Sequence, residues 1–274
     1  MIKEIFTDEQ IAELLSIIKN RYGYDFANYS EASLIRRITR FREVTKTFDF
    51  FELKNRLLND AAYFADFVIE ITVNVTEMFR DPSFFKALRE KVFPYLETYP
   101  FYKVWNAGCS TGEEVYSTAI LLHEKKILDR ARIYATDINS KVLASAREGI
   151  FPLKHMQDYS SNYQKAGGEF SLSDYYVAQY GLAKFDSQLP KNMMFSVHNL
   201  VSDGSFNEFN LIVCRNVMIY FNRKLQERVF RLFYESMPVY GFLALGSKET
   251  LQFSGVYECF EVVDAKEKIY RKIY

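Results

Sequence analysis

The sequence predicts an α/β protein in which a parallel sheet carries helices on both faces. A helical domain precedes the sheet, and a small antiparallel β-subdomain is inserted in it. Apolar residues recur at helical spacing, without convincing strands, through about the first 70 of the 274 residues. Short apolar strands then alternate with helices until one stretch rich in tyrosine, serine and glycine breaks the alternation. We place the helical domain at residues 1–72, the sheet domain at 73–274 and the insertion at 153–192.

The helical domain begins with a capping box. Thr7 is followed three residues later by Gln10, which predicts a helix that starts near residue 8. The apolar residues that follow lie on one face of that helix; they are Ile11, Leu14, Leu15 and Ile18. The same spacing predicts three further helices, at Glu31–Lys46, Phe48–Leu58 and Asp60–Ile71.

The sheet domain begins with a helix that Asp81 is predicted to cap, with Pro82 in its first turn and its end near Pro94. Beyond it, five strands are predicted, at Lys103–Ala107, Ala131–Thr136, Met194–Val197, Phe209–Cys214 and Phe242–Leu245. The helices between them are predicted at Gly112–Lys126, Asn139–Glu148 and Lys224–Met237. The chain closes with a hairpin over residues 260–273, and a second hairpin turn is expected inside the insertion, at Gly167–Gly168.

Composition excludes several classes of function. Lys plus Arg equals Asp plus Glu, at 35 each, so no global field attracts nucleic acid or a membrane. The three cysteines form no CxxC pair and the three histidines are isolated, which argues against a metal site and fits a reducing compartment. No apolar run is long enough to span a membrane, and the N-terminus is not a secretory signal. We expect a cytoplasmic protein without membrane insertion.

Residues 106–116, NAGCSTGEEVY, form a loop between a strand and a helix. Gly108 and Gly112 let a ligand approach the backbone, although many such turns need glycine only for packing. The P-loop pattern is missing because no Gly-Lys-Ser/Thr follows. The dinucleotide pattern is incomplete, and Glu113 and Glu114 would repel a pyrophosphate at the start of the helix.

Asp137 ends the next strand, 29 positions after Gly108. A carboxylate there can accept hydrogen bonds from both hydroxyls of an adenosine ribose. The alternative is that Asp137 caps the helix that begins near Asn139. An adenosine without phosphates, beside a positive group that favours carboxylates, describes S-adenosylmethionine.

Five segments resemble the signatures of the bacterial chemotaxis receptor methyltransferases, the CheR family of protein-glutamate O-methyltransferases. Three of them are WNAGCSTGEEVYS, ATDINSKVLASAREGIF and FNLIVCRNVMIYFN. The segment NVTEMFRD at 74–81 is similar to the family's Asn-x-Thr-x-x-Phe-Arg stretch, and SLIRRITRFR is similar to its basic N-terminal helix. Together they cover most of the chain in the family's order, whereas the middle insertion matches least.

This resemblance implies a Rossmann-like class I methyltransferase sheet, with S-adenosylmethionine as cofactor and S-adenosylhomocysteine as product. Residues at matching positions would bind the cofactor; they are Asn74, Thr76, Arg80, Gly108, Glu114, Asp137, Asn199, Leu200, Arg215 and Asn216. Among these, Asp137 would hold the ribose, and Asn199 and Leu200 would flank the adenine. Tyr220 would lie near the transferable methyl group.

The implied reaction transfers a methyl group to a glutamate carboxylate. That carboxylate has a pKa of about 4.3 and is already ionised near neutral pH, so it needs no general base. The protein then chiefly aligns the reactants and removes water. Arg80 and Tyr220 are the candidate catalytic residues. Their alternative roles are a surface ion pair of Arg80 with Asp81 and a core position for Tyr220.

Arg36, Arg37 and Arg40 fall on one face of a helix, with Arg42 nearby. Such a run is often only a solvated face. The resemblance makes it a docking surface for the glutamate-bearing cytoplasmic helices of chemoreceptors. In some family members the β-subdomain also binds a peptide at the receptor's C-terminus by strand addition. The insertion here is longer and richer in tyrosine, so its aromatic residues are alternatively expected to close a small satellite core.

Two other functions stay open at this point. One is a methyltransferase of the same architecture that acts on another protein or on a small molecule. The other is a non-catalytic adapter that only binds the cofactor. Transfer of a methyl group to receptor fragments separates these from the receptor methyltransferase.

Overall fold

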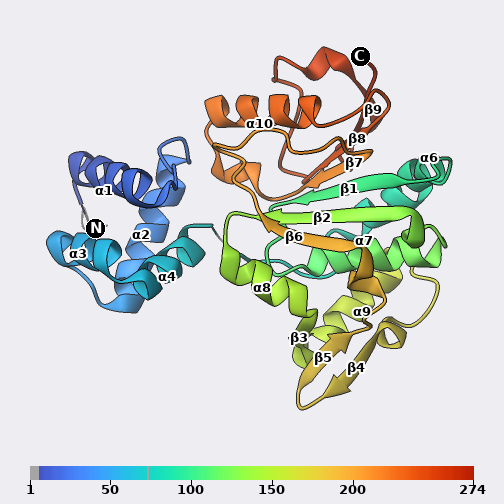
Figure 1. Cartoon of the computed structure of the whole chain (residues 1–274), viewed down its shortest axis with the longest axis horizontal. Helices are drawn as coiled ribbons and strands as arrows, with labels where there is room; N and C mark the ends of the chain where they lie inside the picture. Colours follow the sequence, from blue (N-terminus) through green and yellow to red (C-terminus); the bar gives the residue numbers. More distant parts are fainter. Residues whose placement is uncertain (1–5, 73) are drawn as a thin grey trace. The chain divides into compact units, whose positions relative to one another are not determined.

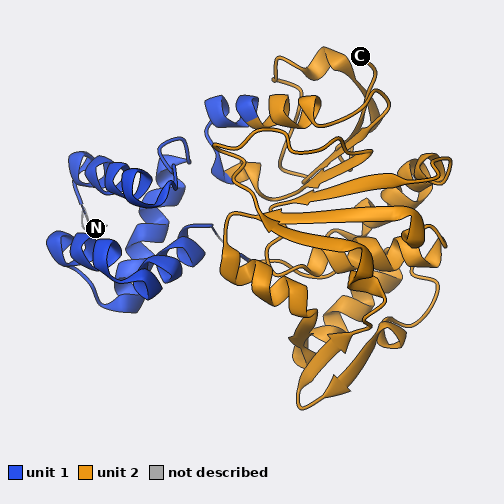
Figure 2. Ribbon diagram, in the orientation of Figure 1, with its two compact units in different colours: residues 1–74, 220–228 blue, residues 75–219, 229–274 orange. Residues whose placement is uncertain are grey.

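The computed structural model describes residues 6–72 and 74–274 (Figure 1). The chain divides into two compact units (Figure 2). The helical unit comprises the chain up to Asn74 together with Tyr220–Arg228, and the sheet unit comprises Val75–Ile219 with Val229–Tyr274. The predicted boundary residue, Val73, lies outside the described residues. Within the described ranges, no helix is both long and apolar enough to cross a membrane.

The helical unit contains the four helices that the sequence predicts: α1 (Asp8–Tyr22), α2 (Glu31–Thr45), α3 (Phe50–Asn59) and α4 (Ala61–Thr72). The capping box is confirmed, because the Gln10 N–H donates to the Thr7 hydroxyl at 3.3 Å and Gln10 Oε1 accepts from the Thr7 N–H at 3.1 Å. The apolar faces of the four helices form one buried core, which includes Leu14, Ile18, Phe41, Leu53 and Phe67.

The sheet unit is built on seven strands in the order β6-β2-β1-β7-β8-β10-β9. They are β1 (Tyr102–Ala107), β2 (Ala131–Asp137), β6 (Met193–Val197), β7 (Leu211–Cys214), β8 (Phe242–Leu245), β9 (Phe260–Asp264) and β10 (Ile269–Lys272). The first five strands of this order pair in parallel, and β10 is antiparallel to both of its neighbours. The predicted alternation and the closing hairpin are confirmed.

Helices cover both faces of the sheet, as the buried, apolar strands predict. The main connecting helices are α7 (Glu113–Glu124), α8 (Ser140–Glu148) and α10 (Arg223–Glu235) (Figure 1). On one face, the Trp105 ring of β1 meets the Phe233 ring of α10, with centroids 5.4 Å apart. On the other, Val104 joins the core that contains Val115 of α7. Because β1, β2, β6 and β7 run in parallel, their carboxyl ends share one edge of the sheet.

The helix after Asp81 differs from its prediction in two respects. Asp81 is in a left-handed conformation, with φ of 57°, and makes no side-chain capping bond. The helix also continues past Pro94, as α5 (Pro82–Ala87), a π-helical turn at Leu88–Val92 and α6 (Phe93–Leu96). Pro94 stands in the first turn of α6, directly after the π-helical turn.

The insertion is half helical, which the sequence analysis did not predict. The helix α9 (Met156–Lys165) precedes a three-stranded antiparallel sheet in the order β3-β5-β4. These strands are β3 (Ile150–Pro152), β4 (Tyr176–Gln179) and β5 (Leu182–Phe185). The hairpin turn lies at Tyr180–Gly181, where φ is 50° and 76°, and Gly167–Gly168 instead ends α9. A glycine pair is a turn signal that does not distinguish a helix end from a hairpin.

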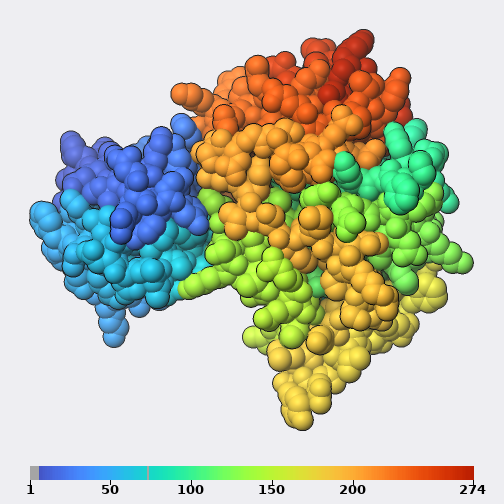
Figure 3. Space-filling model, viewed as in Figure 1, coloured from blue at the N-terminus to red at the C-terminus, as the bar shows by residue number. Residues whose placement is uncertain are grey.

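The buried aromatic residues of the insertion belong to the main core, so the expected satellite core is wrong, whereas Phe170 and Tyr180 are exposed. Tyr163 packs on Phe79 with ring centroids 5.1 Å apart, and Phe185 packs on Tyr116 at 5.6 Å. Glu124, at the end of α7, stabilises the packing of the insertion on the sheet unit, because its buried carboxylate accepts hydrogen bonds from the hydroxyls of Tyr163 and Tyr175. The outer hairpin of β4 and β5 nevertheless protrudes from the sheet unit, in yellow in Figure 3.

Candidate functional site

The loop after β1 lies at the carboxyl edge of the sheet. The N–H groups of Gly108 and Cys109 donate to the carbonyl of Thr136 on β2, at 2.8 and 2.9 Å. Gly108 and Gly112 have φ of 75° and 98°, which favours glycine. A Cβ on Gly108 would lie 2.4 Å from Val217 Cγ2. Packing and backbone conformation therefore explain both glycines, which was the alternative to close approach of a ligand.

Asp137 faces this loop and does not cap the next helix. Its Oδ2 accepts from the Ser110 N–H at 2.9 Å and its Oδ1 from the Asn139 N–H at 3.0 Å. The N-cap of α8 is Asn139, which accepts from the Lys141 N–H. Burial raises the pKa of Asp137, although the N–H groups of Asn139 and Ser110 oppose that shift. The capping interpretation is wrong, and the carboxylate lies where a ligand at the loop would meet it.

Arg215, directly after β7, joins several of the predicted residues into one cluster. Its side chain is 2% exposed, and its Nη1 donates to Glu114 Oε2 at 3.1 Å. Nη2 donates to Asp81 Oδ2 at 2.6 Å, and Nη1 also reaches the carbonyl of Arg80 at 3.2 Å. The guanidinium lies 4.0 Å from the centre of the Phe84 ring. The second glutamate of the GEE run is thus balanced by an internal cation.

The turn at residues 79–81 presents Arg80. Phe79 and Asp81 both have positive φ, 52° and 57°, a conformation that non-glycine residues adopt only when their surroundings hold them there. Here the Phe79 N–H donates to Ser117 Oγ at 2.9 Å and Asp81 is held by Arg215. Asp81 therefore pairs with Arg215, whereas Arg80 donates to the carbonyl of Val75 at 3.4 Å. The expected alternative of an Arg80–Asp81 ion pair is not what the geometry shows.

Asn199 and Leu200 follow β6, beside Asp137. The His198 N–H donates to the carbonyl of Asp137 at 3.2 Å, which ties the two strand ends together. Leu200 is buried, and Asn199 Oδ1 accepts from the Val201 N–H at 3.0 Å within its own turn. Both residues therefore follow a strand end that is tied to the backbone of Asp137.

Five buried polar atoms at this edge have no hydrogen-bond partner within the described part of the chain: Asn106 Oδ1, Ser110 Oγ, Asn139 Nδ2, His198 Nδ1 and Arg215 Nε. Buried polar atoms normally have partners, so atoms like these mark a place for a polar ligand. Asn106 and Ser110 were missed in the sequence analysis although both stand in the glycine loop region. The missed signal is that small polar residues flank Gly108 on both sides.

Asn74 and Tyr220 belong to the helical unit, so they are not part of this cluster. The Asn74 amide donates to the carbonyl of Ile69 at 3.2 Å and to Thr72 Oγ1 at 3.1 Å, which closes the end of α4. Tyr220 is half-buried, and its carbonyl accepts from the Ser30 N–H at 2.7 Å. Thr76 lies half-buried in the segment between α4 and α5.

The basic face of α2 is narrower than its sequence indicates. Arg36 and Arg40 are exposed, but Arg37 has a side chain only 16% exposed and pairs with Glu70 of α4 at 3.3 Å. Glu70 also reaches Arg40, at 3.4 Å. Arg42 is buried and donates to the carbonyl of Phe48. Arg36 and Arg40 are therefore the two members of this basic run that lie open to solvent.

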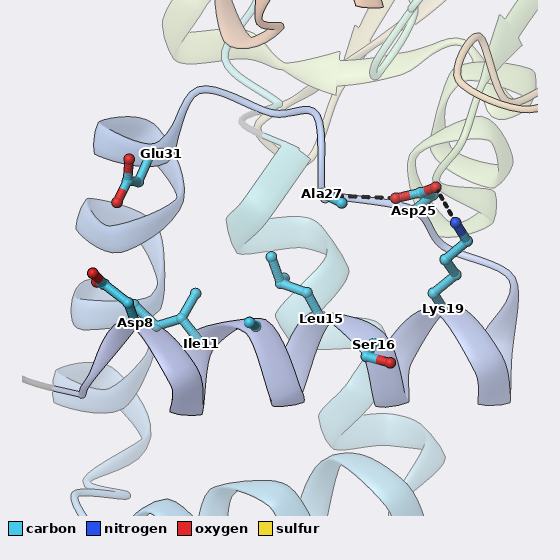
Figure 4. A pocket seen from close by; sticks show the side chains of 9 residues that line it. Asp8, Ile11, Leu15, Ser16, Lys19, Asp25, Ala27 and Glu31 are labelled. Atoms are coloured by element: carbon cyan, nitrogen blue, oxygen red, sulfur yellow. Dashed lines mark hydrogen bonds and ion pairs between the residues drawn. The ribbon is translucent and has the colours of Figure 1, made fainter.

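A hollow of about 350 Å³ also lies in the helical unit, against α1 (Figure 4). Apolar side chains, among them Ile11 and Leu15, form part of its lining. Asp25 at its rim is held by Lys19 at 2.7 Å and by the Ala27 N–H at 3.0 Å. The predicted site residues do not line it.

The chain matches two families of protein domains. "CheR methyltransferase, all-alpha domain" covers residues 9–72, and "CheR methyltransferase, SAM binding domain" covers residues 74–269. The relative Cher3 of Pseudomonas putida is 46% identical over 99% of this chain and 100% of its own length. A chemotaxis protein methyltransferase of Listeria monocytogenes is 31% identical, over 86% of this chain and 87% of its own. One of Salmonella typhimurium is 29% identical, over 89% and 84%.

The cluster at the carboxyl edge suits the cofactor of that family. Asp137 can accept hydrogen bonds from hydroxyl groups, and its carboxylate supplies negative charge, whereas the charge of Glu114 is balanced by Arg215. Ser110 and Asn106 add buried polar atoms that have no hydrogen-bond partner among the described residues. These contacts and the matches along nearly the whole chain lead to one conclusion: the chain belongs to the CheR family of S-adenosylmethionine-dependent methyltransferases.

Proposed function

We propose that this protein transfers the methyl group of S-adenosylmethionine to glutamate side chains on the cytoplasmic helices of chemoreceptors. The products are a glutamate methyl ester and S-adenosylhomocysteine, and the process is the adaptation step of chemotaxis. One observation carries the proposal. Arg215 binds both Glu114 and the carbonyl of Arg80, and this cluster lies beside the loop whose Ser110 N–H is bound by Asp137. Relatives named chemotaxis protein methyltransferase support the choice of substrate.

The reaction needs alignment more than acid–base chemistry. S-adenosylmethionine supplies an electrophilic methyl carbon on a positive sulfur. A carboxylate oxygen of the substrate forms the new bond to this carbon while the carbon–sulfur bond breaks, and the electron pair stays on sulfur. Because the glutamate is ionised near neutral pH, no residue has to remove a proton. In this proposal Arg80 and Tyr220 orient the carboxylate and keep water from it.

The other predicted residues hold the cofactor in this proposal. Asp137 binds the ribose, Asn199 and Leu200 flank the adenine, and Gly108 and Glu114 lie against the amino-acid end. Arg215 and Asn216 follow β7 at the same edge, and Thr76 and Asn74 are assigned to the cofactor by the family resemblance alone. Support comes from the position of most of them at the carboxyl ends of β1, β2, β6 and β7, the edge at which open α/β sheets bind ligands.

A transfer assay tests the substrate. Purified protein is incubated with S-adenosylmethionine that carries a labelled methyl group and with cytoplasmic fragments of chemoreceptors. Label should appear on the fragments and should be lost when the acceptor glutamates are replaced by glutamine. Label on another protein or a small molecule would support a different substrate. Binding of S-adenosylhomocysteine with no acceptor among the candidate substrates would support an adapter.

The same assay tests whether a receptor tail is bound. The sheet of the insertion ends at β4, whose Val177, Ala178 and Gln179 are exposed. An extended peptide could add to that free edge as a further strand. Receptor fragments with and without their last residues are compared. Faster transfer to the longer fragment supports binding at β4, and equal rates contradict it.

Docking on α2 is tested by reversing the two exposed arginines. The double variant Arg36→Glu/Arg40→Glu should raise the KM for receptor about 5- to 10-fold, because complementary charge mainly controls encounter. Arg37 is left intact because, of the two arginines that pair with Glu70, its side chain is the less exposed, at 16% against 64% for Arg40. Arg21→Glu on the exposed side of α1 is the matched control. Affinity for S-adenosylhomocysteine should not change, and its loss would show that α2 has a structural role instead.

A further inference from the structure

Glu249, in the segment after β8, accepts hydrogen bonds from four backbone N–H groups. Its Oε1 accepts from Val217 at 2.9 Å and from Met218 at 2.8 Å. Its Oε2 accepts from Asn216 at 3.1 Å and from Gly246 at 2.6 Å. Glu249 is 5% exposed, and each of its oxygens serves two donors. A buried carboxylate with this many backbone donors is strongly held, because hydrogen bonds to an ion are about twice as strong as neutral ones.

Three of the four donors are consecutive residues of the loop after β7. Consecutive N–H groups can point at one anion only when the chain turns sharply. Asn216 makes that turn with φ of 60°, a conformation for which asparagine is among the better non-glycine residues. The carboxylate at the end of β8 therefore sets the shape of the loop after its parallel neighbour, β7.

Gly246 gives independent evidence that this arrangement is specific. A Cβ at that position would lie 2.7 Å from Glu249 Oε2 and 2.9 Å from the Asn216 nitrogen. Gly246 does not have a positive φ, so backbone conformation does not require glycine there. The close approach of the Glu249 carboxylate and the loop after β7 does require it. Two residues outside the loop, Glu249 and Gly246, are thus specifically suited to pack against it.

The loop that Glu249 holds contacts the cofactor cluster at two points. Its first residue, Arg215, carries the guanidinium that binds Glu114 and Asp81. Its third residue, Val217, lies against Gly108, since a Cβ there would be 2.4 Å from Val217 Cγ2. A shift of the loop would therefore move both the arginine cluster and the neighbour of the glycine loop.

We propose that Glu249 is a positioning residue for the cofactor. It holds the N–H groups of Asn216, Val217 and Met218, and so fixes the loop in the conformation in which Arg215 and Val217 shape the cofactor site. It acts through the backbone without touching the cofactor. This inference rests on the cofactor of the family and not on the identity of the methyl acceptor. Receptor methylation is therefore not needed to test it.

The test measures affinity for S-adenosylhomocysteine by calorimetry and the Tm of the cofactor-free protein. Glu249→Gln keeps the size of the side chain but replaces one oxygen with an NH₂ group, which faces two backbone donors. Its affinity should fall about tenfold or more, the effect of losing one or two charge-assisted hydrogen bonds. Gly246→Ala keeps the carboxylate but adds a methyl group that displaces it from its backbone donors. The affinity should therefore fall about threefold to tenfold.

Glu124→Gln is the matched control. Glu124 is equally buried and also accepts several hydrogen bonds, from Tyr163, Tyr175 and the Glu169 N–H, together with an ion pair to Arg89. It stands at the far end of α7 from the glycine loop. This variant should lose Tm like Glu249→Gln, yet bind S-adenosylhomocysteine within about twofold of wild type, since that is within the spread of an unaffected site.

Each outcome decides the inference. Wild-type affinity in a folded Glu249→Gln overturns it, as does an equal loss of affinity in Glu124→Gln, which would show a general effect of instability. If Glu249→Gln does not fold, Gly246→Ala decides, and wild-type affinity in that variant overturns the inference. Absence of binding by the wild type would overturn the cofactor site as well, whereas failure of receptor methylation alone would overturn only the proposed substrate.

Discussion

The loops after β1 and β7 follow neighbouring parallel strands, and a buried carboxylate holds each, but the two carboxylates are used differently. Asp137 accepts one N–H from the first loop, at Ser110, and the N–H groups of Ile138 and Asn139 in its own turn. Glu249 accepts three from the second loop and a fourth from Gly246. A carboxylate has about four lone-pair sites. Asp137 therefore keeps acceptor capacity for a ligand, whereas the capacity of Glu249 is filled.

The same difference separates binding from positioning. The first loop combines a partly satisfied carboxylate with buried polar atoms that lack partners at Asn106 and Ser110, so it is suited to meet a ligand. The second loop presents Arg215 and Asn216, but the group that shapes it faces only the protein. Substitutions in the first loop should thus act directly on cofactor affinity, and those around the second should act through the placement of other residues.

The largest effect is expected at Asp137. Asp137→Ala removes the acceptor for two ribose hydroxyls, at about 1.5 to 3 kcal/mol for each charge-assisted bond, so affinity for S-adenosylhomocysteine should fall about 100-fold or more. Calorimetry measures it, with the exposed Asp158→Asn of α9 as control. Unchanged affinity in Asp137→Ala would erase the distinction between the two carboxylates.

A large effect on the rate is expected at Arg80, whose turn is held by the arginine of the second loop. Arg80→Ala should lower kcat by about 100-fold, because a misplaced reactant loses that much rate, while affinity for the cofactor product changes less. Single-turnover transfer measures the rate, and Lys86→Ala, an exposed cation on α5, is the control. Near-normal turnover would remove Arg80 from the mechanism.

A smaller effect is expected at Asp81, which binds Arg215 from the solvent side. Its side chain is 43% exposed, so water screens much of the pair's energy. Asp81→Asn should slow transfer only about threefold to fivefold, since Glu114 and the Arg80 carbonyl still hold Arg215. A loss as large as that of Arg80→Ala would mean that Asp81 contacts the reactants itself.

The smallest effect is a dependence on pH. Burial raises the pKa of Asp137, and a protonated carboxyl no longer accepts two hydroxyl hydrogens. As pH falls below neutral, affinity for S-adenosylhomocysteine should weaken in wild type and stay flat in Asp137→Asn. A wild-type affinity that stays constant would show that Asp137 remains fully ionised.

The sign for stability is opposite. A raised folded-state pKa means that ionised Asp137 opposes folding above that pKa, and this penalty is relieved as pH falls through it toward the ordinary value of 3.8. The same direction holds for Glu113 and Glu249, whose pKa values burial also raises. Loss of affinity through Asp137 is therefore not accompanied by a loss of Tm from these groups, and the Tm of the cofactor-free protein is recorded alongside.

Much of the fold and part of the site could be predicted from local pattern. Helical and strand periodicity located the four N-terminal helices and the seven strands of the large sheet, and glycine marked the loop after β1. Asp137 was predicted from its position in the sequence, at the end of the next strand and 29 residues after Gly108. The sequence did not reveal that Asp81 binds Arg215, that Arg37 binds Glu70 or that Glu249 holds the second loop. Each of these contacts joins residues more than 30 positions apart.

Sequence by itself determined the order of the elements and the place of the first loop, because apolar period and glycine conformation act over a few residues. Tertiary structure alone decided which carboxylates became saturated and which kept room for a ligand. That outcome depends on how many backbone N–H groups from a distant loop converge on each one. Asp137 meets one from the first loop, and Glu249 meets three from the second. Convergence of this kind arises only when strand ends far apart in the chain become neighbours in one sheet.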